Sequence, residues 1–476
     1  MTHTSPRDDL SGASVLSHRD ALATIVGEHN VLTGDAVPAR HVQDLWGSDR
    51  IGHAELVVRP PTALQLADVL AFCNRHGQPV VVQGGMTGLV SGGVPDAAEV
   101  VLSTELLDGM DVDVTSQTLV AQAGAILGDA QRLAHKHGLV VPIDLASKDS
   151  ATLGGCVAQN AGGVNVVRYG MTRRHVLSLE VALPDGRLMT LSTPLVKDNA
   201  GMDLKQLFIG SEGLLGVVTA VTLALQPAMP AKAGAFCAVR DVSDALDLLT
   251  ALQRDMAGSV TAFEVMWADA YGVLEHTDLR LPLPFGHPLY VLVECEGNDA
   301  GENSARLVDC LARLDDRLLD TAIAGTAAEL APLWSARERI PSEVLRMQPL
   351  FGFDVSLPAV RLEKALDRMR NEVNALWPAA RLLVFGHLGD DNVHIAVATG
   401  ERNRDRKPEV EDIVYGVVAD FGGSISAEHG VGFEKRDYLS YTRSSDEIAI
   451  MGQLKRLFDP HGILNRGRMI PWDEEN

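Results

Sequence analysis

The sequence is poor in cysteine and in basic residues, and it has no long apolar run. Its five cysteines are scattered and form no Cys-x-x-Cys pair: Cys73, Cys156, Cys237, Cys295 and Cys310. This spacing excludes a disulfide framework, a thiolate zinc site and an iron–sulfur cluster. Lys and Arg number 41 against 63 Asp and Glu, and the resulting net charge of −22 opposes binding to nucleic acid or to an anionic membrane surface.

Segments that direct or anchor a protein are also not apparent. The sequence contains no run of about 18 apolar residues of the kind that spans a bilayer. The first residues, MTHTSPRDDLSG, lack the pattern of a secretory signal. Unpaired cysteines are typical of a reducing compartment. We therefore expect a protein without a transmembrane segment that is located in the cytoplasm.

The 476 residues have an ordinary globular composition and predict more than one domain, at about 100–200 residues per domain. Between Leu64 and Leu225, short β-branched runs alternate with helical stretches, including a strand at 79–82 and helices at 63–76 and 125–137. The sequence QPAMPAKAG, at about 226–234, interrupts this α/β pattern with two prolines and a glycine, as a change of domain would.

The region after this break has a different pattern. We predict strands at 288–294 and 381–387 and helices at 304–318 and 359–376, followed by further helix between Gly430 and Phe458. No internal repeat is visible, which excludes a solenoid.

Glycines are densest directly after the strand at 79–82, in the segment QGGMTGLVSGG at 83–93. Five glycines here predict a backbone that takes positive φ and directs successive N–H groups at an anion such as a diphosphate. The segment matches neither the G-x-G-x-x-G turn nor the G-K-[ST] loop of the common nucleotide-binding folds. A flexible surface loop is the alternative.

Two further glycine segments favour a ligand over that alternative. The tract GGCVAQNAGG at 154–163 is made almost entirely of small residues, so its backbone can lie against a flat molecule, although tight strand–helix packing would need the same residues. The turn FIGSEG at 208–213 places Glu212 where it could accept a ribose hydroxyl.

Together these segments, with the terminal FDPHGILN, resemble the FAD-binding domain of the vanillyl-alcohol-oxidase flavoproteins. Within that group the chain is similar to the FAD-linked D-2-hydroxy-acid dehydrogenases, which include D-lactate, glycolate and D-2-hydroxyglutarate dehydrogenases. The resemblance runs from about Gly52 to Pro471. It implies an α+β protein: a vanillyl-alcohol-oxidase/PCMH-type FAD-binding domain formed by residues 1–227 and 430–476, and an α+β substrate- and metal-binding domain with an antiparallel sheet at 228–429.

The resemblance also implies which residues hold FAD. It assigns the pyrophosphate to the backbone of the first glycine segment, at Gly84, Gly85, Thr87, Gly88 and Leu89. It lines the rest of the cofactor with Ser103, Asp144, Ser147, Gly155, Asn160, Gly163, Val218 and Asn465. Met86, Leu214 and Arg466 depart from the family pattern but remove no glycine. Because no His or Cys occupies a family attachment position, we expect FAD to be bound non-covalently.

The segment RLLVFGHLGDDNVHIAVAT reads as two strands joined by a short polar turn. If residues 388–391 form the turn, His387 pairs with Asn392, and His394 lies two residues further on the same face. Diagonal neighbours on one face are about 7–8 Å apart, so the two rings could converge on one ion. The alternative is two histidines with ordinary hydrogen bonds.

Adjacent Glu428 and His429, set among glycines in SISAEHGVG, strengthen the metal interpretation. Two His and one Glu are a common ligand set for catalytic Zn²⁺, and Mn²⁺ or Fe²⁺ also accept nitrogen and oxygen ligands. The family resemblance implies that His387, His394 and Glu428 bind the metal and that His429 is the catalytic base. Such a metal would lower the pKa of a substrate hydroxyl whose proton His429 accepts, while the α-hydrogen passes as hydride to FAD.

The resemblance assigns Arg337 and His429 to substrate binding, with Arg337 holding the α-carboxylate, a task that suits the bidentate guanidinium. A solvated helix charge is the alternative for Arg337. Relatives that oxidise dicarboxylic acids hold the second carboxylate with Thr, Lys and Asn at positions that read Pro341, Gly352 and Ala396 here. Because an unpaired buried carboxylate is costly, we expect a monocarboxylic, D-lactate-like or apolar D-2-hydroxy acid rather than D-2-hydroxyglutarate.

The expected partners are this hydroxy acid and an external electron acceptor, since the sequence carries no iron–sulfur relay. An electron-transfer flavoprotein, a quinone or a cytochrome would serve, and a homodimer is a compatible assembly. D-2-hydroxyglutarate dehydrogenase and a flavin oxidase that uses O₂ remain alternatives. A zinc hydrolase would leave the glycine segments unexplained. A non-catalytic flavoprotein is a further alternative, and it would differ in that no hydroxy acid bleaches its flavin.

Overall fold

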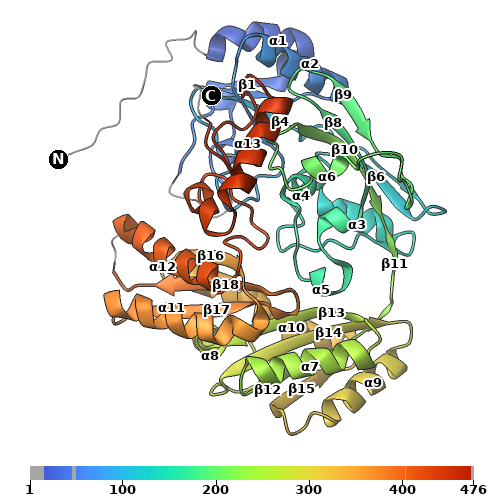
Figure 1. Cartoon of the computed structure of the whole chain (residues 1–476). Helices are drawn as coiled ribbons and strands as arrows, with labels where there is room; N and C mark the ends of the chain where they lie inside the picture. The colour runs from blue at the N-terminus through green and yellow to red at the C-terminus, as the bar shows by residue number, and fades with distance from the viewer. Residues whose placement is uncertain (1–14, 45–49, 402–403, 473–476) are drawn as a thin grey trace.

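The computed structural model of the chain describes residues 15–44, 50–401 and 404–472. The described residues form two lobes (Figure 1). The chain builds most of the first lobe, crosses to the second near residue 227, and returns in its last segment to pack against the first. Within the described part of the chain, no helix has the length and apolar character needed to cross a bilayer.

The first lobe contains three sheets. The first is four-stranded, in the order β1 (Val31–Thr33), β2 (Leu56–Val58), β4 (Val100–Ser103) and β3 (Val80–Gln83), with β2, β4 and β3 parallel. The second is antiparallel, in the order β5 (Met110–Asp113), β6 (Thr118–Gln122), β10 (Val217–Ala224), β8 (Val176–Ala182) and β9 (Leu188–Leu191). The third pairs β11 (Gln226–Pro227) with β7 (Leu139–Val140).

Helices of the first lobe pack on these sheets and connect them. They are α1 (Arg19–Val26), α2 (Ala63–Arg75), α3 (Leu127–His135), α4 (Leu153–Gln159), α5 (Val166–Tyr169), α6 (Lys205–Phe208) and the C-terminal α13 (Ser445–Phe458). The hydroxyls of Thr62 and Thr152 cap α2 and α4 by accepting backbone N–H groups that the first helical turn leaves unpaired. Ser444 and Glu447 form a capping box at the start of α13.

The second lobe is built on one antiparallel sheet of seven strands. Their order is β15 (Leu318–Ala324), β12 (Ala231–Val239), β14 (Leu289–Gly297), β13 (Val260–Trp267), β17 (Arg381–His387), β18 (Asn392–Ala398) and β16 (Phe351–Ser356). The predicted antiparallel sheet of this α+β region is therefore confirmed.

Side chains alternate between the two faces of this sheet, and helices cover both faces. Val384 and Ile395 belong to a core with α7 (Val242–Asp255), α9 (Ala300–Ala312), α11 (Leu362–Leu376) and α12 (Lys407–Asp420). The neighbouring Phe385 and Ala396 belong to a second core with α8 (Ala268–Tyr271) and α10 (Ala327–Leu345). Residues an even number of positions from Phe385 on β17, or from Ala396 on β18, therefore lie on the face that α10 partly covers.

Some of the predicted elements differ from those of the structure. The helix expected at 304–318 ends at Ala312, because Leu318–Ala324 extends instead as the edge strand β15 against β12. The proline-rich break is shorter than a linker, since β12 begins at Ala231. The division into residues 1–227 with 430–476 and residues 228–429 stays a prediction.

Candidate active site

One cavity of about 1400 Å³ runs between the two lobes. Its wall includes the glycine segment after β3, helix α4, and the face of the seven-stranded sheet beside α10. Pockets for single small molecules measure about 300–1,000 Å³, so this cavity has room for a dinucleotide cofactor and a substrate together.

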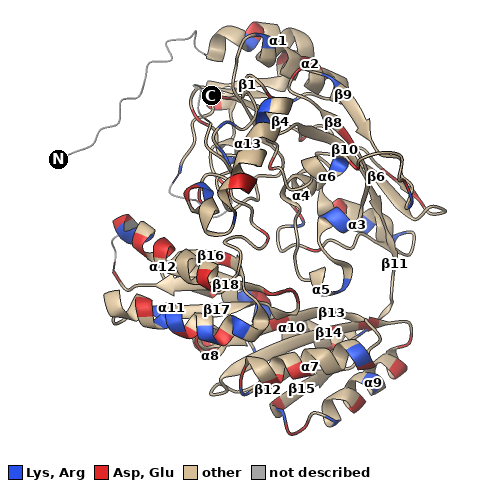
Figure 2. Cartoon of the chain, viewed as in Figure 1, with Lys and Arg blue, Asp and Glu red and all other residues tan. Residues whose placement is uncertain are grey.

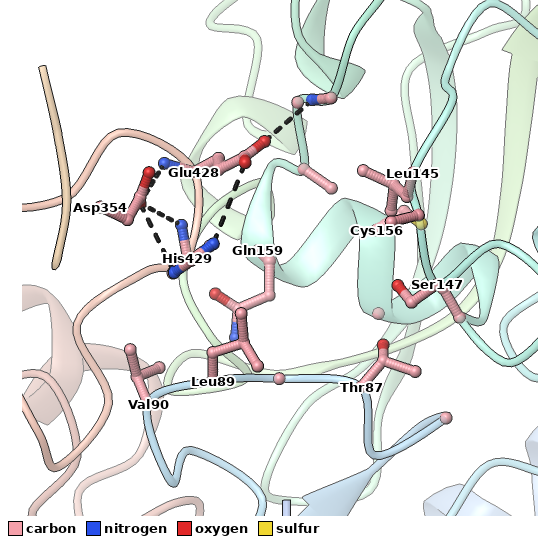
Figure 3. A pocket seen from close by; sticks show the side chains of 18 of the residues that line it. Thr87, Leu89, Val90, Leu145, Ser147, Cys156, Gln159, Asp354, Glu428 and His429 are labelled. Atoms are coloured by element: carbon pink, nitrogen blue, oxygen red, sulfur yellow. Dashed lines mark hydrogen bonds and ion pairs between the residues drawn. The ribbon is translucent and has the colours of Figure 1, made fainter. Parts of the chain in front are cut away.

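All five residues predicted to hold a pyrophosphate line this cavity: Gly84, Gly85, Thr87, Gly88 and Leu89. Figure 3 shows Thr87 and Leu89 on its wall. The glycines act differently from the prediction. The left-handed backbone is taken by Met86 (φ 52°) and Ser91 (φ 56°). The glycines instead permit close approach: a Cβ on Gly85 would lie 1.9 Å from the carbonyl oxygen of Ser150.

Of the other predicted FAD residues, six line the cavity: Asp144, Ser147, Gly155, Gly163, Val218 and Asn465. The remaining two do not. Ser103 is buried with its hydroxyl accepting the backbone N–H of Glu105. Asn160 ends α4 in a left-handed conformation, and its side-chain oxygen accepts the N–H of Arg173. Both residues stabilise the fold around the cavity wall.

Glu212, expected to accept a ribose hydroxyl, lines the cavity and also holds a neighbouring loop. Its carboxylate is buried and accepts the backbone N–H groups of Val431 (2.7 Å) and Gly432 (2.9 Å). Burial raises the pKa of this carboxyl group, and the two amides act against that rise. Glu212 therefore holds the loop that follows His429.

The turn at 388–391 forms as predicted. His387 pairs with Asn392, and Asp391 takes the left-handed conformation (φ 64°) that Asp tolerates. The Nε2 atoms of His387 and His394 face each other at 3.4 Å. The third predicted ligand converges with them, because Oε1 of Glu428 lies 3.9 Å from Nε2 of His387 and 3.8 Å from Nε2 of His394.

These distances fit a metal site. Bonds of about 2.0–2.2 Å at tetrahedral angles place ligand atoms about 3.3–3.6 Å apart, close to the spacing of this His–His–Glu set. Asp354, His394, Glu428 and His429 also have potential ligand atoms within 4.8 Å of one another. We favour His387 over Asp354 as the third ligand, because Oδ1 of Asp354 faces Nδ1 of His394 at 3.6 Å, whereas His387 and Glu428 both face its Nε2.

Buried carboxylates flank both histidines. Oε1 of Glu264 contacts Nδ1 of His387 at 2.5 Å. Oε2 of Glu264 accepts the Nε–H group of Arg337 at 2.9 Å and forms an ion pair with its Nη2 at 2.9 Å. Burial alone would lower the pKa of His387, but the Glu264 carboxylate raises it to about 9. Burial lowers the pKa of His394 well below 6.5, and the positive charge of His387 lowers it further.

Glu428 and His429 lie on the loop that enters the cavity after α12. Oε2 of Glu428 accepts the N–H of Gly163 at 2.9 Å, which ties the loop to the first lobe. The ring of His429 lies parallel to that of His394, with centroids 5.9 Å apart. Figure 3 shows His429 below Asp354 and Glu428, with Gln159 of α4 beside it on the side of Leu89.

Sequence reasoning did not identify Glu264 and Asp354. Each lies in an otherwise apolar strand, VTAFEVMW and FGFDVS, and each is almost completely buried. An acidic residue at an inward position of a buried strand needs a partner, and that pattern could have identified both residues.

Comparison with known proteins adds three findings. The family described as "FAD binding domain" matches residues 54–192, and the one described as "FAD linked oxidases, C-terminal domain" matches residues 228–469. D-2-hydroxyglutarate dehydrogenase from Rattus norvegicus is 37% identical over 88% of this chain and 79% of its own, and the enzyme from Danio rerio is 35% identical over 90% and 80%. The D-2-hydroxyglutarate–pyruvate transhydrogenase of Saccharomyces cerevisiae is 34% identical over 89% and 88%.

Solved structures support the fold prediction. 4-Ethylphenol oxidase from Gulosibacter chungangensis aligns with a TM-score of 0.74 at 17% identity, covering 97% of this chain and 99% of that one. p-Cresol methylhydroxylase aligns with a TM-score of 0.73 at 14% identity, covering 96% of both chains. The predicted PCMH-type α+β fold is thereby confirmed.

The prediction of a cytoplasmic location is wrong, as the names of the sequence relatives indicate. The D-2-hydroxyglutarate dehydrogenases of rat and zebrafish are both named as mitochondrial proteins. Unpaired cysteines indicate a reducing environment, but they do not distinguish one reducing compartment from another.

Proposed function

The chain belongs to the family of FAD-linked D-2-hydroxy-acid dehydrogenases, and we propose that it oxidises a monocarboxylic D-2-hydroxy acid in a reaction that requires a divalent metal. The observation that carries the metal dependence is the convergence of His387, His394 and Glu428 on one point of the cavity wall. Zn²⁺ suits this ligand set, and Mn²⁺ or Fe²⁺ would also be accepted.

In the proposed reaction, Arg337 binds the α-carboxylate of the substrate. The guanidinium lines the cavity and is held by Glu264, so its orientation is fixed before substrate arrives. Bound FAD supplies the hydride acceptor, and a bound divalent metal supplies a Lewis acid that lowers the pKa of the substrate hydroxyl. His429 accepts the hydroxyl proton.

The preference for one carboxylate rests on the cavity wall beside Arg337. Gly352 of β16 pairs with Ala396 of β18, and both line the cavity together with Pro341 of α10. Three positions that could hold a second carboxylate therefore carry no charge or polar side-chain group. Burial of an unpaired polar group costs about 2–7 kcal/mol, and burial of an unpaired charged carboxylate costs more. This wall therefore favours a substrate with an apolar substituent.

The lysines of the cavity wall do not replace the missing groups. Each lies within 4.0 Å of a carboxylate: Lys148 with Asp144, Lys232 with Glu294, Lys407 with Glu434, and Lys435 with Asp354. A second substrate carboxylate would have to compete with these ion pairs. D-2-hydroxyglutarate is the second candidate substrate, favoured by the names of the rat and zebrafish relatives.

Anaerobic reduction of the bound flavin tests the proposal. We expect D-lactate and D-2-hydroxybutyrate to bleach the flavin absorbance with a higher second-order rate constant of flavin reduction than D-2-hydroxyglutarate. A clear preference for D-2-hydroxyglutarate would contradict the substrate assignment. Hydrogen peroxide formed under air at a rate that matches substrate oxidation would identify O₂ as the acceptor and make the enzyme an oxidase.

A further inference from the structure

Four neighbouring strands of the seven-stranded sheet carry a row of acid, histidine, histidine and acid on one face. Glu264 of β13 pairs in register with His387 of β17, and Asp354 of β16 pairs with His394 of β18. The two imidazoles occupy the middle of the row with their Nε2 atoms facing each other, and the two carboxylates occupy its ends. Each histidine therefore has a buried carboxylate on its outer side.

Asp354 also holds the loop that carries the other site residues. Its Oδ2 accepts the N–H groups of Ala427 (3.1 Å), Glu428 (2.9 Å) and His429 (2.9 Å). Its Oδ1 is buried, makes no hydrogen bond to any residue in the described ranges, and lies 3.6 Å from Nδ1 of His394. A small movement of the ring would bring this pair to hydrogen-bond distance.

We propose that Asp354 is a positioning residue that sets the tautomer of His394 and the position of Glu428 and His429. The inference rests on the metal-dependent function proposed above. One carboxylate thereby orients two of the three candidate metal ligands and the candidate base.

The tautomer follows from the acceptor character of a carboxylate. A neutral imidazole carries one N–H group, and beside Oδ1 of Asp354 that group is stabilised on Nδ1 of His394. The lone pair then lies on Nε2, which faces His387 and Glu428. Without the carboxylate, an imidazole protonated on Nε2 would direct a proton at the metal position and could not act as a ligand.

The loop is held from its other end as well. Glu212, in the first lobe, accepts the N–H groups of Val431 and Gly432. Gly430 lies between the two sets of hydrogen bonds with φ +84°, and a Cβ there would lie 2.4 Å from Oε1 of Gln159. The loop is therefore fixed to both lobes, and Asp354 provides the fixation on the metal side.

The variant Asp354→Asn tests the inference. If the Asn oxygen keeps the three loop amides, its NH₂ group faces Nδ1 of His394 and favours the tautomer that is protonated on Nε2. We expect the affinity for Zn²⁺, measured by competition with a chromophoric chelator, and for Mn²⁺, measured by electron paramagnetic resonance, to fall about 10–100-fold while FAD stays bound. Unchanged metal affinity in the folded variant would overturn the inference.

Asp459→Asn is the matched control. Asp459 is a buried carboxylate that accepts two backbone N–H groups, from Ile463 and Leu464, and pairs with Lys455 in the first lobe. This variant should lose stability and keep its metal affinity. An equal loss of metal affinity in both variants would mean that general destabilisation explains the effect, and would also overturn the inference.

A measurement on the unchanged protein covers the case in which Asp354→Asn does not fold. In FAD-loaded, metal-free protein with ¹⁵N-labelled histidine, the ring of His394 should carry its proton on Nδ1, with the signal assigned by its loss in His394→Gln. A proton on Nε2 would overturn the inference.

If the unchanged protein binds neither Zn²⁺ nor Mn²⁺, the proposed metal-dependent function fails, and the inference fails with it. Metal binding that is unaffected by Asp354→Asn leaves the function in place and overturns only the inference.

Discussion

At the scale of single residues, the position of His429 carries the proposed proton transfer. Its Nε2 lies 3.9 Å from Oε1 of Glu428 and its Nδ1 lies 3.8 Å from Oδ2 of Asp354, while the ring itself is partly open to the cavity. The imidazole is thus held close to the candidate metal ligands without a tight hydrogen bond that would occupy both nitrogens.

Replacement of His429 by Gln should separate binding from chemistry. Removal of a general base costs about 10²–10⁴-fold in rate, so we expect flavin reduction by substrate to slow by that factor. FAD content and metal content should equal those of the unchanged protein, because His429 is in neither predicted set. Stopped-flow absorbance under anaerobic conditions gives the rate, and near-normal reduction would remove His429 from the role of base.

Ala396→Asn should change the substrate preference. The side chain at 396 lines the cavity opposite Gly352, so an amide here offers hydrogen bonds to a second carboxylate. A hydrogen bond to a charged group contributes about 1.5–3 kcal/mol, so the ratio of kcat/KM for D-2-hydroxyglutarate to that for D-lactate should rise at least about tenfold. Ala398→Asn, on the same strand face and outside the cavity wall, is the control. An unchanged ratio in Ala396→Asn would show that this wall does not select the substrate.

The residues that could be predicted from the sequence are those in short, dense segments. His387, His394, Glu428 and the glycines after β3 stand in local patterns, and the structure brings the two histidines and Glu428 together. Glu264 and Asp354 could not be placed the same way, because their partners come from other strands, up to 123 residues away for Glu264 and His387. The use of the Glu212 carboxylate also depends on a distant loop.

At the scale of secondary-structure elements, the glycine segment after β3 is shaped by its contact with the turn before α4. A Cβ on Gly85 would overlap the carbonyl oxygen of Ser150, and one on Gly84 would lie 2.4 Å from Oγ1 of Thr152. Thr152 in turn caps α4. The segment and the helix therefore hold each other in place along the cavity wall.

Gly85→Ala should destabilise this part of the fold. An overpacked site typically costs about 1–3 kcal/mol, and we expect a lower free energy of unfolding and a lower ratio of flavin to protein. Gly88→Ala is the control, because a Cβ there meets no atom within 4 Å. Its free energy of unfolding, from chemical denaturation, should change by less than about 0.5 kcal/mol. Equal stability of the two variants would contradict the packing argument.

Elements with a clear local signal were predictable, and those that depend on distant pairing were not. Helix α2 and the pairing of His387 with Asn392 agree with the sequence. The strand β15 was not predicted, and the expected helix ran to its first residue, Leu318. Its edge position against β12 leaves Leu319 and Ile323 exposed and produces no buried β-branched run. Tertiary pairing decided the structure there.

At the scale of the whole molecule, the charge lies outside and the cavity lies between the lobes. Figure 2 shows acidic and basic positions along the outer helices α7, α9, α11 and α12, whereas the strands of the seven-stranded sheet are mostly uncharged. The net charge of −22 is therefore compatible with an anionic substrate, since Arg337 and a divalent metal would make the site locally positive.

The five cysteines should be inert in the folded protein. All are buried, and burial raises the pKa of Cys73, Cys156, Cys237 and Cys295 to about 12 and that of Cys310 to about 11. Because the thiolate is the reactive form, a chromogenic disulfide reagent at pH 8 should modify essentially none of them before unfolding and all five after it. Rapid modification of any thiol in the native protein would contradict this burial.

The central claim is that one cavity couples FAD to a metal held by His387, His394 and Glu428. The direct test is the rate of anaerobic flavin reduction by D-lactate in protein depleted of metal by a chelator and then reconstituted with Zn²⁺ or Mn²⁺. We predict that depletion abolishes reduction, leaves the flavin absorbance spectrum intact, and is reversed by metal. Flavin reduction at the full rate after verified metal removal would contradict the account.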